Sequence, residues 1–264
     1  MSFIPEDSEW IRQHYEGVPA ETTSWVGDLH GLDVLDVGCG ELLTGFGLMT
    51  LGIGTLTALD VHDHPPDFVD SVHQHLLAKG YDVPRDHRER VAFVGYDGEH
   101  MPFPDEAFDL VFCWGVLEHV ANVPQVLEEA FRVTRAGGRA FLFTYPFWPS
   151  FYGSHLTDFI HEPFFHLRYD ADWVRQRLDE HSAAHPEVRD LLLYLWEEYN
   201  SLNHLGSSEY HAMVRKAGFK TEAIDLITTK QDVSLAPDTY PIEDLLICGS
   251  RLLLTKPAGH TLVG

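Results

Sequence analysis

The sequence has little positive charge. Its 18 lysine and arginine residues stand against 41 aspartate and glutamate residues, and the formal net charge is -23 at pH 7. A surface of this sign repels phosphate groups, which argues against nucleic acid and anionic membrane surfaces as partners. We therefore expect a small-molecule partner, no nucleic acid and no membrane. The sequence leaves open whether the chain forms a homodimer.

Cysteine is scarce, and long apolar runs are lacking. The three cysteines, Cys39, Cys113 and Cys248, form no CxxC pair, which predicts reduced thiols and no zinc knuckle. No apolar stretch is long enough to span a bilayer, and no charged-then-apolar leader begins at Met1. These features predict a soluble protein of the cytoplasm.

Strand and helix patterns alternate along most of the chain. Short apolar runs predict strands over 34–37, 55–59, 91–94, 108–114, 140–145, 221–227 and 251–255. Helical patterns lie between them over 42–51, from Asn122 and Pro124 to the Gly137-Gly138 pair, and over 208–217. Strands that alternate with helices predict an α/β fold with a doubly wound, mostly parallel sheet.

This rhythm breaks between residues 147 and 206. The segment opens with aromatic and histidine residues and closes with an amphipathic helix that begins near Pro186. We therefore expect four parts in the chain. They are a helical lead-in or lid over 1–30, an α/β core that binds the cofactor over 31–146, a helical insertion that caps the substrate over 147–206, and the completion of the core over 207–264.

The segment Val34–Gly40 joins a predicted strand to a helix through a glycine turn, which lets a ligand approach the backbone. A dinucleotide site needs a third glycine where this chain has Leu43. The carboxylate of Asp36 would also repel a pyrophosphate. S-adenosylmethionine (SAM) has no phosphate and carries two cationic groups, so the loop favours SAM over NAD. Asp60, at the end of the second strand, is placed to bind ribose hydroxyls.

Several motifs together resemble the class I SAM-dependent methyltransferases, in the type 11-like group with a Leu-Glu-His motif after the fourth strand. They are Val34–Gly40, Asp60, Asp97-Gly98, Phe108–Val111 and Leu117–Val120. The resemblance implies a Rossmann-like methyltransferase fold with a seven-stranded sheet, and SAM as the cofactor. It implies that SAM is bound by Asp36, Gly38, Cys39, Gly40, Asp60, Val61, Asp97, Gly98 and Trp114. The family often has a third glycine where this chain has Leu42.

Histidines are the candidate catalytic residues. An alcohol that accepts a methyl group benefits from a general base or a metal ion near its proton. His119 follows the fourth strand, and His155 and His161 lie in the insertion, where a helix would bring them near one face together with Asp158. The alternatives are a structural role for His119 and a chance cluster in a chain with 17 histidines.

A divalent metal ion is less favoured than a metal-free site. Glu118 and His119 are the candidate ligands, but a metal-dependent subgroup of quinone O-methyltransferases has a further acid where this chain has Gly115. Aromatic side chains suit the wall of a substrate pocket. The predicted wall residues are Tyr15, Tyr145, Trp148 and Tyr152.

The sequence therefore predicts SAM-dependent methyl transfer to a small molecule. The preferred reaction is O-methylation of a polar hydroxyl on a sugar-like or natural-product acceptor. N- or C-methylation is the alternative within this class of enzyme. An NAD-dependent oxidoreductase and a non-catalytic SAM-binding protein are the alternatives outside it.

Overall fold

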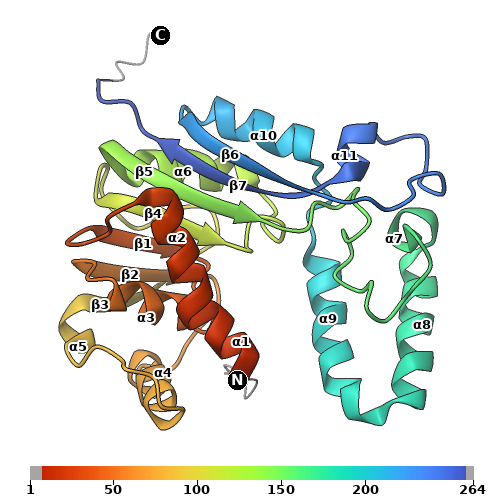
Figure 1. The fold of residues 1–264 in the computed structure, drawn as a ribbon, viewed down its shortest axis with the longest axis horizontal. Coiled ribbons are helices and arrows are strands. Elements are labelled where there is room, and N and C mark those ends of the chain that lie inside the picture. Colours follow the sequence, from red (N-terminus) through yellow and green to blue (C-terminus); the bar gives the residue numbers. More distant parts are fainter. Residues whose placement is uncertain (1–7, 260–264) are drawn as a thin grey trace.

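The computed structural model describes residues 8–259, and its centre is a seven-stranded sheet with the order β3-β2-β1-β4-β5-β7-β6 (Figure 1). Strand β7 pairs antiparallel with β5 and β6, and the other neighbouring pairs are parallel. The predicted α/β fold with a mostly parallel sheet is confirmed. The strands are β1 (Asp33–Val37), β2 (Thr55–Asp60), β3 (Val91–Gly95), β4 (Phe108–Trp114), β5 (Thr134–Thr144), β6 (Lys220–Thr228) and β7 (Ile247–Thr255).

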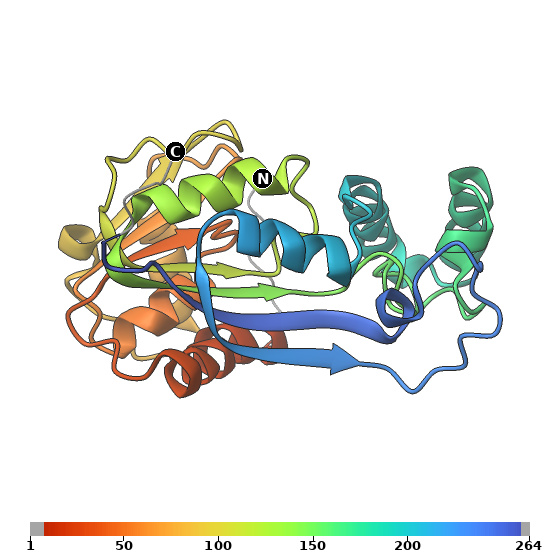
Figure 2. The same ribbon diagram turned by 90° about the horizontal axis from the view of Figure 1, so that it is seen from above.

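Helices cover both faces of the sheet (Figure 2). One face packs against α1 (Ser8–Arg12), the π-helical turn η1 (Gln13–Gly17), α2 (Val18–Val26), α3 (Leu43–Thr50) and α4 (Phe68–Ala78). The other face packs against α6 (Val123–Val133) and α10 (Ser207–Lys216). Neighbouring residues of a strand enter opposite cores, as Val34 and Leu35 do in β1, because side chains alternate across a sheet. Two short helices, α5 (His87–Arg90) and α11 (Ile242–Leu246), precede β3 and β7.

The Gly137-Gly138 pair lies inside β5 and does not end the preceding helix, so the predicted boundary there is wrong. Helix α6 ends at Val133, and β5 begins at the next residue. The pairing of β4 with β5 is irregular between Phe108 and Leu110. A Cβ atom on Gly138 would lie 2.9 Å from the carbonyl oxygen of Arg135. Gly138 therefore serves a close backbone approach within the strand, and Gly137 supplies a positive φ of 77°.

The insertion has a hydrophobic core of its own. It contains α7 (Phe165–Arg168), α8 (Ala171–Ala184), the 3₁₀ turn η2 (Pro186–Val188) and α9 (Arg189–Ser201), and it stands beside the sheet (Figure 1). Its buried side chains include Trp148, Leu156, Phe165, Val174, Leu178, Leu192 and Tyr199. Residues 155–161 form turns and irregular backbone, and not the helix that would bring His155 and His161 near one face. His155 has a left-handed backbone conformation, with φ at 60°, which no residue of a right-handed helix adopts.

The predicted lead-in over 1–30 and the final part over 207–264 extend beyond the described residues at 1–7 and 260–264. Between residues 8 and 259, no helix combines the length and the apolar character that crossing a membrane requires. The three cysteines are buried and carry free thiols.

Candidate functional site at the carboxyl edge of the sheet

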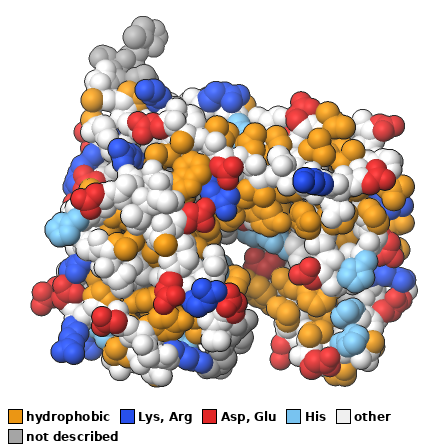
Figure 3. Space-filling view, in the orientation of Figure 1, with side chains coloured by type: hydrophobic (Ala, Val, Ile, Leu, Met, Phe, Trp, Pro, Cys, Tyr) orange, Lys and Arg blue, Asp and Glu red, His pale blue; other side chains and the backbone are white. Residues whose placement is uncertain are grey.

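The candidate site lies where the strand order reverses. Strand β1 is hydrogen-bonded to β2 on one side and to β4 on the other, so the loops that follow β1 and β4 leave the sheet next to each other. Ligands of open α/β sheets bind in the crevice at such a switch point. The surface is hollowed between the core and the insertion, and acidic and histidine side chains lie in this hollow (Figure 3).

The glycine turn after β1 is held close to the loop after β4. Gly38 has a φ of 72°, and its backbone N–H donates to the carbonyl oxygen of Leu59 at 2.7 Å. A Cβ atom on Gly38 would lie 2.4 Å from Cγ2 of Val116, so a side chain cannot be placed there. At Gly40 no atom lies within 4 Å of an added Cβ, which leaves open space beside the turn. The turn therefore joins the two loops and leaves room for a ligand.

Leu42 occupies the position at which the family often has glycine. Its φ is 62°, in the left-handed region, and its side chain is fully buried. Left-handed backbone costs a side-chain-bearing residue roughly 1–2 kcal/mol. Burial of a leucine side chain contributes about 1.5–3 kcal/mol and offsets that cost. The chain therefore keeps the left-handed turn without the glycine, and α3 begins at the next residue.

Two buried carboxylates lie beside this turn. Asp60 accepts hydrogen bonds from the backbone N–H groups of Gly40 and His62, each at 2.9 Å. Oδ2 of Asp36 has no hydrogen-bond partner, and burial together with the nearby Asp60 raises the pKa of Asp36 to about 7. Burial also raises the pKa of Glu41. A cationic ligand would relieve this concentration of buried negative charge, and a pyrophosphate would add to it.

The loops after β2 and β3 form a second side of the same edge. Val61 is 54% exposed, and a Cβ atom on Gly98 would lie 3.3 Å from its Cγ1 atom. Asp97 accepts hydrogen bonds from the backbone N–H groups of Glu99 and His100, which hold the pKa of Asp97 at about 2. The exposed apolar side chain of Val61 thus lies on the same side as the ionised carboxylate of Asp97. This arrangement fits an adenine ring and its amino group.

Cys39 and Trp114 complete the predicted cofactor residues. The backbone N–H of Cys39 donates to the carbonyl oxygen of Leu59 at 3.2 Å, and burial raises the pKa of its thiol. Trp114 ends β4 and stacks on Phe143, with 4.2 Å between the ring centroids. Both residues lie at the ends of the central strands. Their contact with SAM stays a prediction.

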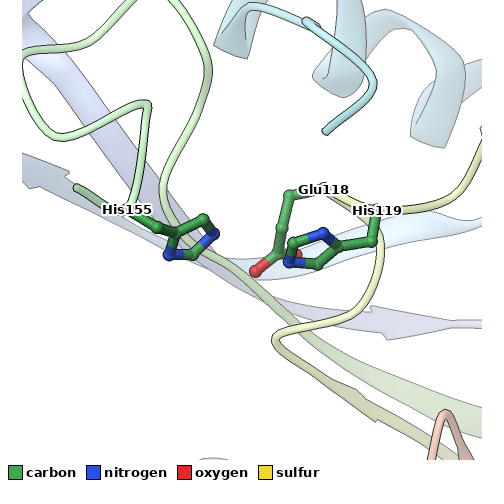
Figure 4. Close-up of side chains that lie close together, drawn as sticks. All are labelled: Glu118, His119 and His155. Carbon is green, nitrogen blue, oxygen red and sulfur yellow. The ribbon is translucent and has the colours of Figure 1, made fainter. Parts of the chain in front are cut away.

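Glu118, His119 and His155 converge on one point. Each offers a ligand atom, and these atoms lie within 4.8 Å of one another. Figure 4 shows the Glu118 carboxylate directed into the space between the two imidazole rings. Burial raises the pKa of Glu118 to about 8 and lowers the pKa of each histidine to about 4. His161 is exposed and is not part of this cluster.

Helix α9 adds residues that the sequence reasoning did not find. Nδ1 of His119 lies 2.6 Å from Oγ of Ser201, and Nε2 of His119 lies 3.4 Å from Oε2 of Glu198. The side-chain amide of Asn203, just after α9, donates to the carbonyl oxygens of Leu117 and Val120. These residues come about 80 positions after the loop they contact, and no motif in the sequence marks them.

The predicted pocket residues do not all lie together. Tyr145 and Tyr152 have ring centroids 6.4 Å apart. Trp148 lines a small cavity together with Glu118. Tyr15 is buried in the other core, where its hydroxyl donates to the carbonyl oxygen of Asp82 at 2.9 Å. Trp148 therefore lies near Glu118. Tyr15 packs with the N-terminal helices instead.

Comparison with known proteins agrees with this geometry. The family model described as "Methyltransferase domain" matches residues 35–142. The chain is 32% identical over 124 residues to a ubiquinone biosynthesis O-methyltransferase of Pseudomonas entomophila, across 46% of this chain and 49% of that protein. It is 31% identical over 152 residues to a demethylmenaquinone methyltransferase of Symbiobacterium thermophilum, across 53% and 51%. The chain spans about half the length of these curated relatives.

Solved structures show the same fold over most of the chain. A SAM-dependent methyltransferase from Methanosarcina mazei has a TM-score of 0.53 and 14% identity, covering 90% of this chain and 98% of that chain. An S-adenosylmethionine-dependent methyltransferase from Mesorhizobium loti has a TM-score of 0.51 and 14% identity, covering 89% and 96%. Residues 35–142 therefore match the methyltransferase domain family, and the described chain has the fold of the SAM-dependent methyltransferases that its motifs resemble.

Proposed function

We propose that the chain transfers the methyl group of SAM to a hydroxyl group of a small molecule. The observation that carries this proposal is that an acidic glycine turn and a cluster of glutamate and histidine side chains lie at the same edge of the sheet. The turn beside Asp36 and Asp60 favours a cation, and the loop after β4 presents Glu118 and His119 to an imidazole of the insertion. The first surface suits the cofactor, and the second suits an acceptor that must lose a proton.

At the cofactor end, Asp36, Gly38 and Gly40 would hold the methionine part of SAM. Asp60 would accept a hydrogen bond from the ribose, since its Oδ2 atom has a further lone pair beyond its contact with the backbone N–H of Gly40. Asp97 would accept from the adenine amino group. Bound SAM supplies a methyl group already activated on a sulfonium, so the protein's main task is to align the acceptor with it.

At the acceptor end, the cluster of Glu118, His119 and His155 would orient the hydroxyl and take its proton. Oε2 of Glu118 and Nε2 of His155 are buried polar atoms without hydrogen-bond partners, so both are available to a hydroxyl. Trp148 would contribute to the pocket wall, and the insertion over 147–206 would cap the acceptor. The O-methyltransferase name of one relative supports oxygen as the methylated atom.

The test is a turnover assay with isotopically labelled SAM and a panel of hydroxylated, amine-bearing and carbon-nucleophile metabolites. We expect one S-adenosylhomocysteine released for each methylated hydroxyl, identified by mass spectrometry and NMR of the product. A product methylated on nitrogen or carbon would overturn the oxygen assignment. SAM binding by calorimetry without turnover of any acceptor would favour a non-catalytic SAM-binding protein. Binding of NAD in place of SAM would overturn the proposal as a whole.

A further inference from the structure

The hydrogen bonds around His119 assign its tautomer. Ser201 has one hydroxyl proton, and it donates that proton to the carbonyl oxygen of Glu198 at 2.8 Å. The oxygen of Ser201 must then accept from Nδ1 of His119, which lies 2.6 Å away. In the neutral imidazole the proton is therefore on Nδ1, and Nε2 presents a lone pair.

This lone pair faces further acceptors. Oε2 of Glu198 lies 3.4 Å from Nε2 of His119. Oε2 of Glu118 and Nε2 of His155 are buried and have no hydrogen-bond partner, and Glu118 is only 5% exposed. Buried polar atoms that converge without hydrogen-bond partners are unfavourable unless a cation or a further hydrogen-bonding group joins them. The arrangement is therefore incomplete with the protein's own groups.

The donor set specifies the class of cation. Two imidazoles and a carboxylate suit a divalent transition-metal ion such as Zn²⁺, whereas Mg²⁺ and Ca²⁺ favour oxygen ligands alone. A ligating imidazole commonly donates its second N–H to an oxygen, which fixes the ring, as Nδ1 of His119 does to Ser201. Glu198 adds a second negative charge at the rim of the cluster, so the two carboxylates balance a divalent ion.

The third ligand comes from the insertion and not from the loop after β4. Gly115, with φ at 66°, has no side chain, although a Cβ atom there would lie 3.8 Å from Oε1 of Glu118. His155 reaches the same carboxylate from the other side (Figure 4). Its left-handed backbone, at φ 60°, is a conformation that non-glycine residues adopt mainly where the surroundings require it. The sequence alone does not favour a metal site, because Gly115 stands where the metal-dependent subgroup has an acid.

We propose that Glu118, His119 and His155 bind one divalent transition-metal ion, which joins the insertion to the loop after β4. Three protein ligands leave coordination positions open, as in catalytic zinc sites. The acceptor hydroxyl would occupy an open position; this second part rests on the proposed function, whereas metal binding does not.

The test is metal binding by the full chain without SAM or acceptor. Protein freed of metal with EDTA is titrated with Zn²⁺ by calorimetry and with Co²⁺ by visible absorption. We expect one tight site per chain and ligand-field bands typical of nitrogen and oxygen ligands. Glu118→Gln and His155→Asn should each weaken binding by about 100-fold, since loss of an outer-shell partner alone costs about 10–100-fold. Asparagine is chosen at 155 because it tolerates the left-handed backbone.

His161→Asn is the matched control, because His161 is an exposed histidine of the same insertion. It should keep the tight site and the Co²⁺ spectrum. Circular dichroism establishes that the variants fold, and Zn²⁺ should raise the Tm of the wild type but not of folded His155→Asn. Absence of a tight site, or equal affinity in wild type and folded His155→Asn, would overturn the proposal. A chain that binds Zn²⁺ but methylates no acceptor would contradict the proposed function and leave the metal site standing.

Discussion

The cofactor half and the acceptor half of the site are assembled in different ways. The cofactor half comes from neighbouring strands, and Asp60 ties its glycine turn together through the backbone N–H of Gly40. The acceptor half joins side chains of two distant segments, and two of its buried acceptor atoms, on Glu118 and His155, have no partner. The first half is largely preformed by short-range contacts. The second depends on how the insertion docks, so changes there should affect catalysis without affecting SAM.

The largest effect is expected from His119→Ala. Loss of the group that assists proton removal should lower kcat by about 100-fold or more, since such assistance contributes 10²–10⁴ in rate. SAM affinity should stay unchanged, because His119 contacts the insertion and not the cofactor turn. Steady-state kinetics and calorimetry measure the two quantities. The control is His185→Ala, an exposed histidine of the insertion. An equal loss of SAM affinity and kcat would break the division between the two halves.

Asp60→Ala tests the other half. Removing hydrogen bonds to a charged group should weaken SAM binding by about 1.5–3 kcal/mol. Calorimetry with SAM gives this value directly, and kcat at saturating SAM should change much less. Asp63→Ala is the matched control, because Asp63 is an exposed aspartate in the following loop. Unchanged affinity in Asp60→Ala would remove Asp60 from the cofactor site.

Leu42→Gly separates backbone strain from packing in the cofactor turn. Glycine relieves roughly 1–2 kcal/mol of left-handed strain. The loss of a buried leucine side chain costs about 2–5 kcal/mol. The lost packing should therefore outweigh the relief of backbone strain. We expect the free energy of unfolding to fall by about 1–3 kcal/mol, measured by urea denaturation. A stabilised Leu42→Gly protein would mean that strain dominates at this position.

The smallest effect is a pH dependence of SAM binding. Burial and Asp60 raise the pKa of Asp36 to about 7, so this group is largely protonated below pH 7. A cationic ligand binds better to the carboxylate, so affinity should rise with pH and level off above that pKa. Between pH 6 and pH 8 the change should be about 10-fold, because the ionised fraction of a group with a pKa of about 7 rises by about that factor over this range. Asp36→Asn should remove this dependence, and a pH profile unchanged by Asp36→Asn would contradict the assignment.

The sheet could be predicted because its strands are short, apolar and bounded by polar turns. The predicted strand over 108–114 coincides with β4, and the aspartate that ends β2 is Asp60. The glycine pair at 137–138 misled the prediction, since a glycine pair ends a helix as readily as it permits a close approach within a strand. Local patterns therefore predicted the strands better than the boundaries between elements.

The acceptor half could not be predicted to the same extent. His119 and His155 were candidates by residue type, but their meeting depends on a left-handed turn at His155 and on the docking of α9. Neither feature has a local sequence pattern. A helix over 155–161 would group His155 with His161 instead, and the structure has turns there. The approach of His119 to His155 depends on tertiary packing, and the periodicity of the sequence carries no information about such packing.

The anchoring of the insertion at both ends has a consequence for how acceptors can change. The side-chain amide of Asn203 donates to the carbonyl oxygens of Leu117 and Val120 at the exit of the insertion, and at its entry the backbone N–H of Phe147 donates to the carbonyl oxygen of Cys248 in β7. The two ends of the insertion are thus held to the core by contacts that do not involve the outer ends of α8 and α9. We expect that the turn between α8 and α9, residues 185–188, can therefore be exchanged without disturbing the cluster of Glu118, His119 and His155. If the insertion caps the acceptor as proposed, acceptor specificity can change at its outer end while the cluster beside the sheet stays the same.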